Sequence, residues 1–504
     1  MYLLLSTLGF IYLIFGNRTL IENYMKQFYL FFILCSMSII SCSAENDESN
    51  DEKAVEIFAT ELKTFLGVGE EQELKVTSEE IWKITSDSKW LTFTPSSGKG
   101  TANILVTAAY NFGECRTAKC FISNENERIS LEILQEKAVK PVKNKKVGDP
   151  NIVFDQNKMD EHYPQMEHWI KAGVEGGIPF LQDEMKNIKH IFESNVTAEQ
   201  LAVTIKALSN DGGGTILLKN GTYHFGSVIR MYNKISVIGE SKEGVKIIIG
   251  ESMKEGKLFD FYNSRNSGLR NVTIQGGWNN EDGNNYPKYP WNEDAPVELP
   301  DVSVVSIGMG GAMNCWIDNV SVINSALHPI YISDKGEHNT IRNVEIDGCF
   351  NKGGGCQGYL YIGGTSNLIT GCKVTHLRHI SMQGENSRYN VMYDNDFRQE
   401  VSFHSGDGGN NLIEYNRILI PEDMPVIYYA IMGPWSDQHT VGGVNYLYRN
   451  NCQEDNHRGV IPWSDPRTVY QGPWEVKPKD PHTNFTPSRK YLPKGGTFYP
   501  VMLD

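Results

Sequence analysis

The stretch that decides the fold reads Asn319-Val320-Ser321-Val322-Ile323, an asparagine followed by β-branched and apolar residues in alternation. The same pattern returns at Asn343-Val344-Glu345-Ile346 and at Asn416-Arg417-Ile418-Leu419-Ile420. Alternation of this kind indicates short strands rather than helices. Most copies also carry an asparagine five positions earlier. The pairs are Asn266/Asn271, Asn314/Asn319, Asn390/Asn395, Asn411/Asn416 and Asn445/Asn450, with His338/Asn343 and Asn367/Cys372 as weaker copies.

The spacing of these copies indicates a repeat architecture. Asn319 and Asn343 are 24 residues apart, Cys372 and Asn395 are 23 apart, and Asn395 and Asn416 are 21 apart. A period near 24 residues with three short strands per turn is typical of a parallel β-helix. We predict that the recurring asparagines stack as an internal ladder, where their amides bond backbone groups that the turns leave unsatisfied.

The segment that opens the repeat supports this prediction. Thr197-Ala198-Glu199-Gln200 is a capping box, and it predicts a helix with Leu201, Ile205 and Leu208 on one face. Residues 212–218 and 220–223 follow as GGGTILL and NGTY. This combination resembles the N-terminal cap and first coil of the pectate-lyase-like right-handed β-helix superfamily. The resemblance implies such a domain over residues 196–470, with an irregular C-terminal cap at 471–504. It implies no single reaction, because the superfamily contains lyases, hydrolases, transferases and tailspikes.

Residues 54–137 show the shorter alternating runs of antiparallel strands. The segments Trp82, Ser88-Lys89-Trp90-Leu91, Pro95-Ser96-Ser97-Gly98 and Ile133-Leu134-Gln135 together resemble the BACON domain. That resemblance implies a small immunoglobulin-like β-sandwich, of the kind that accompanies carbohydrate-active enzymes, either as a glycan binder or as a spacer. The expected fold class is therefore all-β. Residues 138–150, rich in lysine and proline, are expected to be a linker, and residues 151–195 an extension of the next domain.

The first 42 residues are expected to be a targeting segment. Met25-Lys26 provides a positive start and is the expected initiation site, and an apolar stretch follows at 28–40. Ile39-Ile40-Ser41-Cys42 resembles a bacterial lipobox, which implies lipidation of Cys42. The acidic run at 43–48 resembles the tags that send lipoproteins of Bacteroidetes-type bacteria to the cell surface. We expect an exported, lipid-anchored protein at the cell surface or outer membrane, with an uncleaved N-terminal anchor as the alternative.

Composition narrows the class of partner. The chain has 504 residues, a formal net charge of −14 and 40% hydrophobic residues, which together indicate a globular, acidic protein. Such a charge argues against a nucleic-acid binder, which needs a basic face. Apart from Cys35 and Cys42, seven cysteines stand at irregular spacing, without a zinc pattern. Cys115 and Cys120 fit a hairpin disulfide and equally two reduced side chains.

Counting outward from the ladder positions locates a candidate site. The count places His379 beside Ser402 and Ser381 beside His404, with the apolar residues between them facing inward. The candidate catalytic residues gathered in this way are His404, His379, Arg398, Glu385, Asp407 and Glu400. The candidate substrate-binding residues are Tyr359, Tyr361, Gln383, Arg388, His439 and Trp435. This is the densest ionisable cluster in the chain.

Three functions fit these residues, and all of them take an extracellular polysaccharide as partner. The first is a polysaccharide lyase that cleaves a uronate-containing glycan by β-elimination, with His404 as base, Arg398 or Arg388 as the neutralising cation, and His379 or Tyr361 returning a proton. The second is a glycoside hydrolase using a carboxyl pair from Glu385, Glu400 and Asp407. The third is a non-catalytic glycan binder using Tyr359, Tyr361, Trp435 and Trp463.

Known catalytic patterns of related families do not decide among these functions. Asp394-Asn395-Asp396 lacks the other motifs of polygalacturonases, and the calcium-binding aspartates of pectate lyases are not recognisable. No cofactor is assigned from the sequence, although a divalent cation such as calcium is compatible with the fold that the resemblance implies.

Overall fold

The computed structural model describes residues 57–65, 70–88, 90–108, 115–136, 145–288, 296–403, 405–424, 430–434, 436–452, 467–476 and 485–503. It divides the chain into two compact units, Met1–Val142 and Lys143–Asp504. Each unit has its own buried core, and each is described by itself.

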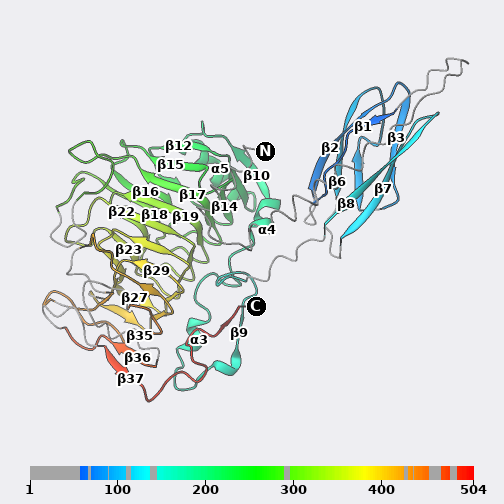
Figure 1. Cartoon of the computed structure of the whole chain (residues 1–504). Coiled ribbons are helices and arrows are strands. Elements are labelled where there is room, and N and C mark those ends of the chain that lie inside the picture. Colours follow the sequence, from blue (N-terminus) through cyan, green and yellow to red (C-terminus); the bar gives the residue numbers. More distant parts are fainter. Residues whose placement is uncertain are drawn as a thin grey trace, which may run out of the picture. The chain divides into compact units, whose positions relative to one another are not determined.

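The first unit is an antiparallel β structure, drawn in blue to cyan in Figure 1. Over its described residues, two four-stranded sheets share one apolar core that includes the fully buried Trp82. One sheet has the order β1 (Phe58–Ala59), β2 (Glu70–Thr77), β6 (Ala102–Ala108), β4 (Leu91–Thr94). The other has the order β5 (Ser97–Lys99), β3 (Ile81–Ser86), β7 (Arg116–Ser123), β8 (Arg128–Gln135). Cys115 and Cys120 are both free thiols, so the hairpin disulfide is not formed.

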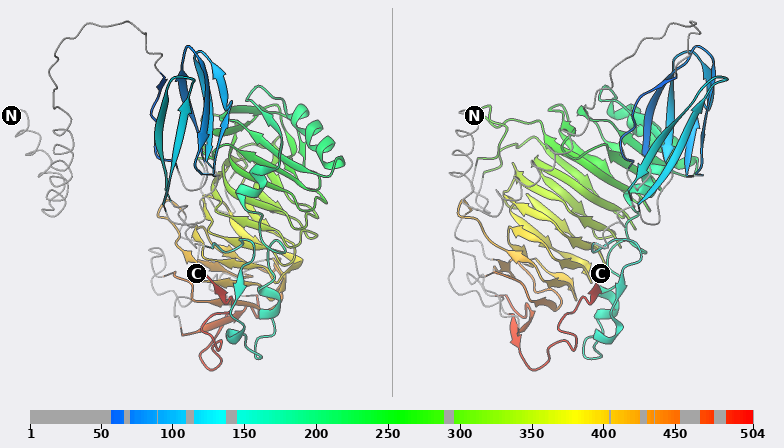
Figure 2. Two further views of the ribbon diagram at one scale, coloured as in Figure 1. Left: turned by 90° about the vertical axis from the view of Figure 1, so that its right-hand side faces the viewer. Right: turned by 45° about the vertical axis from the view of Figure 1, so that its right-hand side comes forward.

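The second unit is a parallel β-helix, as the period predicts. Figures 1 and 2 show its strands stacked coil upon coil from green through yellow to orange. In the described residues, one side is an eight-stranded parallel sheet. Its strands are β13 (Ile229–Arg230), β16 (Glu255–Asp260), β18 (Ser303–Gly308), β20 (His328–Ile332), β23 (Tyr359–Ile362), β26 (His379–Met382), β30 (Val401–Ser402) and β34 (Ile431–Met432).

The remaining sides belong to an eighteen-stranded sheet over the described residues, to which most coils contribute two strands. Its strands are β10 (Ile188–Phe192), β11 (Gly214–Leu218), β12 (Gly221–Phe225), β14 (Ile235–Gly239), β15 (Val245–Ile249), β17 (Gly268–Gly276), β19 (Trp316–Ser325), β21 (Thr340–Arg342), β22 (Glu345–Cys349), β24 (Leu368–Thr370), β25 (Lys373–Thr375), β28 (Val391–Tyr393), β29 (Asp396–Arg398), β32 (Leu412–Glu414), β33 (Arg417–Ile418), β35 (Asn445–Tyr448), β36 (Val469–Gly472) and β37 (Thr486–Ser488). The last two strands pair antiparallel. Two small pairs complete the fold: β27 (Gly384–Arg388) with β31 (Asp407–Gly409), and β9 (Val153–Phe154) with β38 (Val501–Met502).

The helices in the described part of this unit precede the repeating coils in the sequence. They are the 3-10 helix η1 (Gln156–Lys158), α3 (Met166–Trp169), α4 (Leu181–Lys186) and α5 (Ala198–Asn210). Helix α5 begins with the predicted capping box, in which the Thr197 hydroxyl accepts a hydrogen bond from the Gln200 N–H at 3.2 Å. Leu201 and Ile205 are buried against the first coils, so α5 closes that end of the core. No helix among the described residues is long and apolar enough to cross a bilayer.

The asparagine ladder is confirmed in the later coils. Asn339, Asn367, Asn390, Asn411 and Asn445 form one stack, in which each Nδ2 donates to the Oδ1 of the next at 2.9 to 3.0 Å. Each Oδ1 also accepts the backbone N–H of the residue one coil before it. A second stack contains Asn395, Asn416 and Asn450.

In the earlier coils the predicted inward ladder is displaced by one residue, although Asn319 Nδ2 donates to Asn271 Oδ1 at 2.9 Å. Asn266, Asn271, Asn314, Asn319, His338 and Asn343 have φ between 52° and 54° and stand one position before the inward site. Asparagine is among the few side chains that tolerate this left-handed conformation, which explains its recurrence there. The repeat in the sequence therefore combines two uses of asparagine, one in the turn and one in the ladder.

Replacing Asn395 with alanine should lower the free energy of unfolding by roughly 2–4 kcal/mol, because several buried polar groups lose their hydrogen-bond partner. The Asn395 side chain accepts a hydrogen bond from the Cys372 N–H and donates to the Ile369 carbonyl and to Asn416 Oδ1. The urea midpoint measured by circular dichroism checks this, with Asn279→Ala as the control because Asn279 is exposed. Equal midpoints for the two variants would contradict the ladder's structural role.

Residues that precede the coils pack across the outer side of the eighteen-stranded sheet. Val147 and Trp169 share a buried cluster there with Leu368 and Phe498. The Trp169 indole N–H donates to the Asn410 carbonyl at 2.6 Å. Figure 2 shows this extension, in cyan, beside the red C-terminal segment. The described part of the expected linker, 145–150, therefore lies against the coils at Val147, which is buried in this cluster.

Candidate active site

The candidate site lies on the outer face of the eight-stranded sheet. Alternation along β23 and β26 turns Leu360, Ile362, Ile380 and Met382 into the core, so that the residues between them face outward. In the parallel register, Tyr359 lies beside His379 and Tyr361 lies beside Ser381. Counting from the ladder predicts that these residues face outward, and the structure has them on the outer face of β23 and β26.

The register of the next coil differs from the prediction. Ser381, not His379, lies opposite Ser402, and Ile380 lies opposite Val401. The reason is that the chain from Asn395 to Val401 is two residues shorter than the chain from Cys372 to Ile380, the residue that pairs with Val401. Ser381 consequently has Ser402 as its neighbour rather than His404, and His404 itself lies outside the described residues.

A buried histidine–carboxylate pair stands at the centre of this face. His379 is 5% exposed and Glu400 is 0% exposed. The Nδ1 of His379 hydrogen-bonds to Oε1 of Glu400. With Glu400 ionised, the carboxylate can only accept, so the proton of this contact lies on Nδ1 and Nε2 carries the lone pair. Such an oriented imidazole can take a proton from a substrate and later return it.

Two stacked tyrosines, Tyr331 and Tyr361, lie beside the pair and are called the tyrosine wall. The rings of Tyr331 and Tyr361 stack with centroids 4.5 Å apart and an interplanar angle of 15°. The ring of Tyr359 lies 4.9 Å from that of His379. Burial raises the pKa of Tyr361 above its usual range, so its hydroxyl keeps its proton. Tyr331 was missed from the sequence, although Ile330-Tyr331-Ile332 repeats the pattern of Leu360-Tyr361-Ile362.

His328 and Arg378 are further residues of the face that sequence reasoning missed. Burial lowers the pKa of His328 to about 4, so this ring is neutral at pH 7. Its Nδ1 accepts a hydrogen bond from the Tyr359 N–H at 3.1 Å. The Arg378 guanidinium lies 5.7 Å from the Tyr359 ring centroid and donates to the Gly353 carbonyl. Burial, and then the Arg378 charge, lower the pKa of His439.

The two arginines expected to neutralise substrate charge lie elsewhere. Arg398 is on β29 in the eighteen-stranded sheet, where its Nε pairs with Asp396 at 3.2 Å. Arg388 is exposed at the end of β27 and donates to Asn386 at 3.1 Å. Arg398 stands three residues before β30, and the chain turns a corner of the coil between the two. Arg378, whose guanidinium lies over the Tyr359 ring, is instead a cation close to His379.

The three candidate carboxylates have three different environments. Glu385 is exposed on β27, and Glu400 is bonded to His379. Asp407 is buried on β31, where it accepts hydrogen bonds from the Gly409 N–H at 2.6 Å and from the ladder amides of Asn411 and Asn445. Asp407 therefore completes the asparagine ladder.

The remaining predicted substrate-binding residues are Gln383, His439 and Trp435. Gln383 Oε1 accepts a hydrogen bond from the Ser381 hydroxyl at 3.4 Å. His439 is half-buried, with its Nδ1 3.2 Å from the Ser436 hydroxyl. Trp435 and Trp463 lie outside the described residues. Within the described ranges, no group of three or more histidine, cysteine, aspartate or glutamate side chains is placed to hold a metal ion.

The environment of Asp407 predicts a pH dependence of stability. Burial raises its pKa to about 7 from 3.8, and the three donors oppose the rise only in part. Its protonated form therefore stabilises the fold below about pH 4, and that contribution of roughly 4 kcal/mol is lost as the pH rises through 7. Urea unfolding from pH 4 to 8 should show this loss in the wild type and in Asp301→Asn, an exposed control. Asp407→Asn should lack it, and parallel curves for all three proteins would contradict the assignment.

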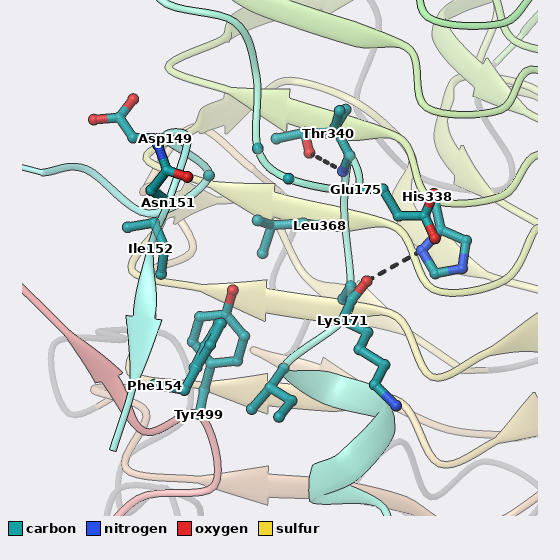
Figure 3. Close-up of a pocket in the computed structure, with 16 residues that line it drawn as sticks. Asp149, Asn151, Ile152, Phe154, Lys171, Glu175, His338, Thr340, Leu368 and Tyr499 are labelled. Atoms are coloured by element: carbon teal, nitrogen blue, oxygen red, sulfur yellow. Dashed lines mark hydrogen bonds between the residues drawn. The ribbon is translucent and has the colours of Figure 1, made fainter. Parts of the chain in front are cut away.

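A separate pocket of about 410 Å³ lies on the outer side of the eighteen-stranded sheet, and none of the candidate residues lines it (Figure 3). It is bounded by the extension, the C-terminal Tyr499, and Thr340 and Leu368 of the coils. The Thr340 hydroxyl accepts the Val174 N–H at 2.9 Å, and His338 Nδ1 lies 3.1 Å from the Lys171 carbonyl.

Comparisons with known proteins give only remote structural neighbours. No family model matches the chain, and no curated protein matches it. A Bacteroides ovatus GH5 xyloglucanase in complex with a XXXG heptasaccharide is 12% identical with a TM-score of 0.17, over 34% of this chain and 46% of that one. An iota-carrageenase complexed to iota-carrageenan fragments is 16% identical with a TM-score of 0.27, over 50% and 60%. A tailspike protein mutant of E. coli bacteriophage HK620 in complex with a pentasaccharide is 12% identical with a TM-score of 0.30, over 52% and 53%. The chain spans about half the length of these proteins, and likenesses this weak carry no functional argument.

Proposed function

We propose that this protein is a carbohydrate-active enzyme that cleaves a uronate-containing extracellular polysaccharide by β-elimination. The single observation that carries the proposal is the buried His379–Glu400 pair on the outer face of a parallel sheet. The tyrosine wall and Arg378 beside the pair support it, because they supply stacking surface and positive charge at the same place.

The residues of the face suit the steps of an elimination. Nε2 of His379 takes the proton next to the uronate carboxylate, while Glu400 stabilises the imidazolium that forms. Negative charge then builds on the uronate, where the Arg378 guanidinium can offset it. As the new double bond forms, the glycosidic oxygen leaves and takes a proton from the Tyr361 hydroxyl, which burial keeps protonated. His379 thus takes the role that the sequence analysis gave to His404, which lies outside the described residues.

A panel of polysaccharides tests the proposal. Alginate, polygalacturonate, chondroitin sulfate and neutral xyloglucan would each be incubated with the purified protein. An elimination raises ultraviolet absorbance from the unsaturated product together with the number of reducing ends, and we expect both on one uronate polymer. Reducing ends without absorbance would favour a glycoside hydrolase. Binding without either signal would favour a glycan-binding protein.

We also propose that the protein is exported and anchored by lipid at Cys42, which lies outside the described residues. Metabolic labelling with a palmitate analogue should mark the wild type and leave Cys42→Ala unlabelled. Cys115→Ala is the matched control, because Cys115 is an exposed free thiol and should keep the label. Equal labelling of all three proteins would overturn the lipobox assignment.

A further inference from the structure

The outer face of the eight-stranded sheet continues from the tyrosine wall toward the first coils. Neighbouring strands place Tyr361 beside Tyr331, and Tyr331 beside Gly308. Gly308 in turn lies beside Asp260, and Asp260 lies beside Arg230. One column of outward positions therefore runs from the coils of the proposed reaction centre to Asp260 and Arg230, which lie four and five strands away from β26.

The charged group at this end of the column consists of Arg230, Lys257 and Asp260, two cations and one carboxylate. Asp260 pairs with Arg230 at 3.0 Å and with Lys257 at 3.7 Å. Both cationic side chains keep about a third of their surface exposed, at 30% and 32%. One carboxylate thus pairs with two cations, and both cationic side chains remain accessible to a ligand.

An exposed aromatic ring and two glycines complete the group. Tyr262 is 52% exposed, with the Arg230 guanidinium 5.1 Å and the Lys257 ammonium 5.9 Å from its ring centroid. A Cβ on Gly308 would stand 2.1 Å from Lys257 Cδ, so only glycine lets this side chain lie across the strand. A Cβ on Gly310 would meet the Tyr262 ring at 3.3 Å, the Ser333 hydroxyl at 3.5 Å and the Lys257 ammonium at 3.6 Å. An aromatic face, a hydroxyl and an ammonium group therefore converge at one point.

We propose that Arg230, Lys257 and Tyr262 form a remote subsite that binds an acidic sugar residue of the polymer whose cleavage is proposed at His379. The inference rests on the proposed function for the identity of that polymer. The sheet order from β16 to β26 contains four steps, so Lys257 and His379 are ~19 Å apart along the face, the length of about four sugar residues. An arginine fork beside a lysine suits carboxylate or sulfate, and the tyrosine ring suits the apolar face of a sugar.

Such a subsite would also counteract the charge of the whole chain. The protein carries a formal net charge of −14, which repels a polyanion at long range. A local excess of positive charge at the entrance of the face would offset this repulsion. Binding at the subsite should consequently weaken as salt is added.

Affinity electrophoresis tests the subsite without requiring turnover. The full mature chain would be run through gels containing alginate, polygalacturonate or chondroitin sulfate, and through a gel of uncharged hydroxyethylcellulose. The proteins are the wild type, His379→Ala, the double variant Arg230→Gln/Lys257→Gln and a control of equal charge change, Lys206→Gln/Lys246→Gln. The control residues are exposed on α5 and on the other sheet. We expect the wild type, His379→Ala and the control to be retarded by at least one acidic polymer, and the double variant to bind about tenfold more weakly or worse.

The outcomes separate this inference from the proposed function. Retardation that depends on Arg230 and Lys257, without cleavage of any polymer, keeps the subsite and overturns the proposed enzyme. Cleavage of an acidic polymer with unchanged affinity in the double variant overturns the subsite and keeps the enzyme. Equal retardation by hydroxyethylcellulose, or none by any acidic polymer, also overturns the subsite. Should the double variant fail to fold, Lys257→Gln alone is the substitute, and loss of salt-sensitive binding in it would support the same conclusion.

Discussion

Replacing His379 with alanine should lower turnover on the cleaved polysaccharide by about 100-fold or more, the usual cost of losing a positioned acid–base group. The imidazole is the group proposed to take the substrate proton, and its Nδ1 is held by Glu400, which fixes its orientation. His190→Ala is the matched control, because His190 is exposed on β10 and far from the face in the fold. Wild-type turnover in His379→Ala would show that the face is misassigned.

A companion variant distinguishes chemistry from stability. Because His379 is buried, its loss leaves the Glu400 carboxylate without this partner, and the melting temperature of the variant must be measured beside its activity. Glu400→Gln keeps an oxygen that can accept the Nδ1 proton but removes the charge that stabilises the imidazolium. We expect a fall in kcat of roughly 10- to 100-fold, with the acidic limb of the pH profile displaced. An unchanged pH profile would contradict the proposed role of Glu400.

Replacing Arg270 with alanine should destabilise the second unit by roughly 3–5 kcal/mol, the cost of leaving buried charges uncompensated. Arg270 is 2% exposed and pairs with Glu184 of α4 and, at 3.0 Å, with Asp318. Asp318 also binds Arg342 at 2.8 Å, and Arg342 binds Asp149. This network ties the extension before the coils to the outer side of the eighteen-stranded sheet.

The measurement for Arg270 is the urea midpoint together with limited proteolysis. Burial already raises the pKa of Glu184 despite the neighbouring arginine, so the loss of Arg270 leaves that carboxyl in a still less favourable place. We expect faster cleavage within residues 145–186 of Arg270→Ala, and no change in Arg265→Ala, where the arginine is exposed. If Arg270→Ala behaved as Arg265→Ala does, the network would contribute nothing to holding the extension.

The fold could be predicted from the sequence because its period and its asparagines are local signals. Helix α5 followed directly from Thr197 and Gln200, and the later ladder followed from the spacing of Asn390, Asn411 and Asn445. The earlier ladder positions were displaced by one residue, because asparagine serves the left-handed turn and the inward stack equally well.

The candidate site could be predicted only in part, because turn lengths differ between coils. His379, Tyr359 and Tyr361 were placed on the correct outer face, since alternation within one strand fixes which side a residue takes. The contact of His379 with Glu400 depends on the path from the ladder to the paired strand residue, which is two residues shorter in the next coil, and no local pattern shows this difference. Pairs such as Arg270 and Glu184, 86 residues apart, are set by how the extension packs.

The central claim is that a glycan is cleaved on the outer face of the eight-stranded sheet. A crystal structure of His379→Ala with an oligosaccharide of the cleaved polymer tests it most directly. We predict sugar rings across β23, β26 and β30, with the glycosidic oxygen next to the place vacated by the imidazole and within reach of Tyr361. Sugar bound in the pocket of Figure 3 or on the first unit, with the face of His379 empty, would contradict the account.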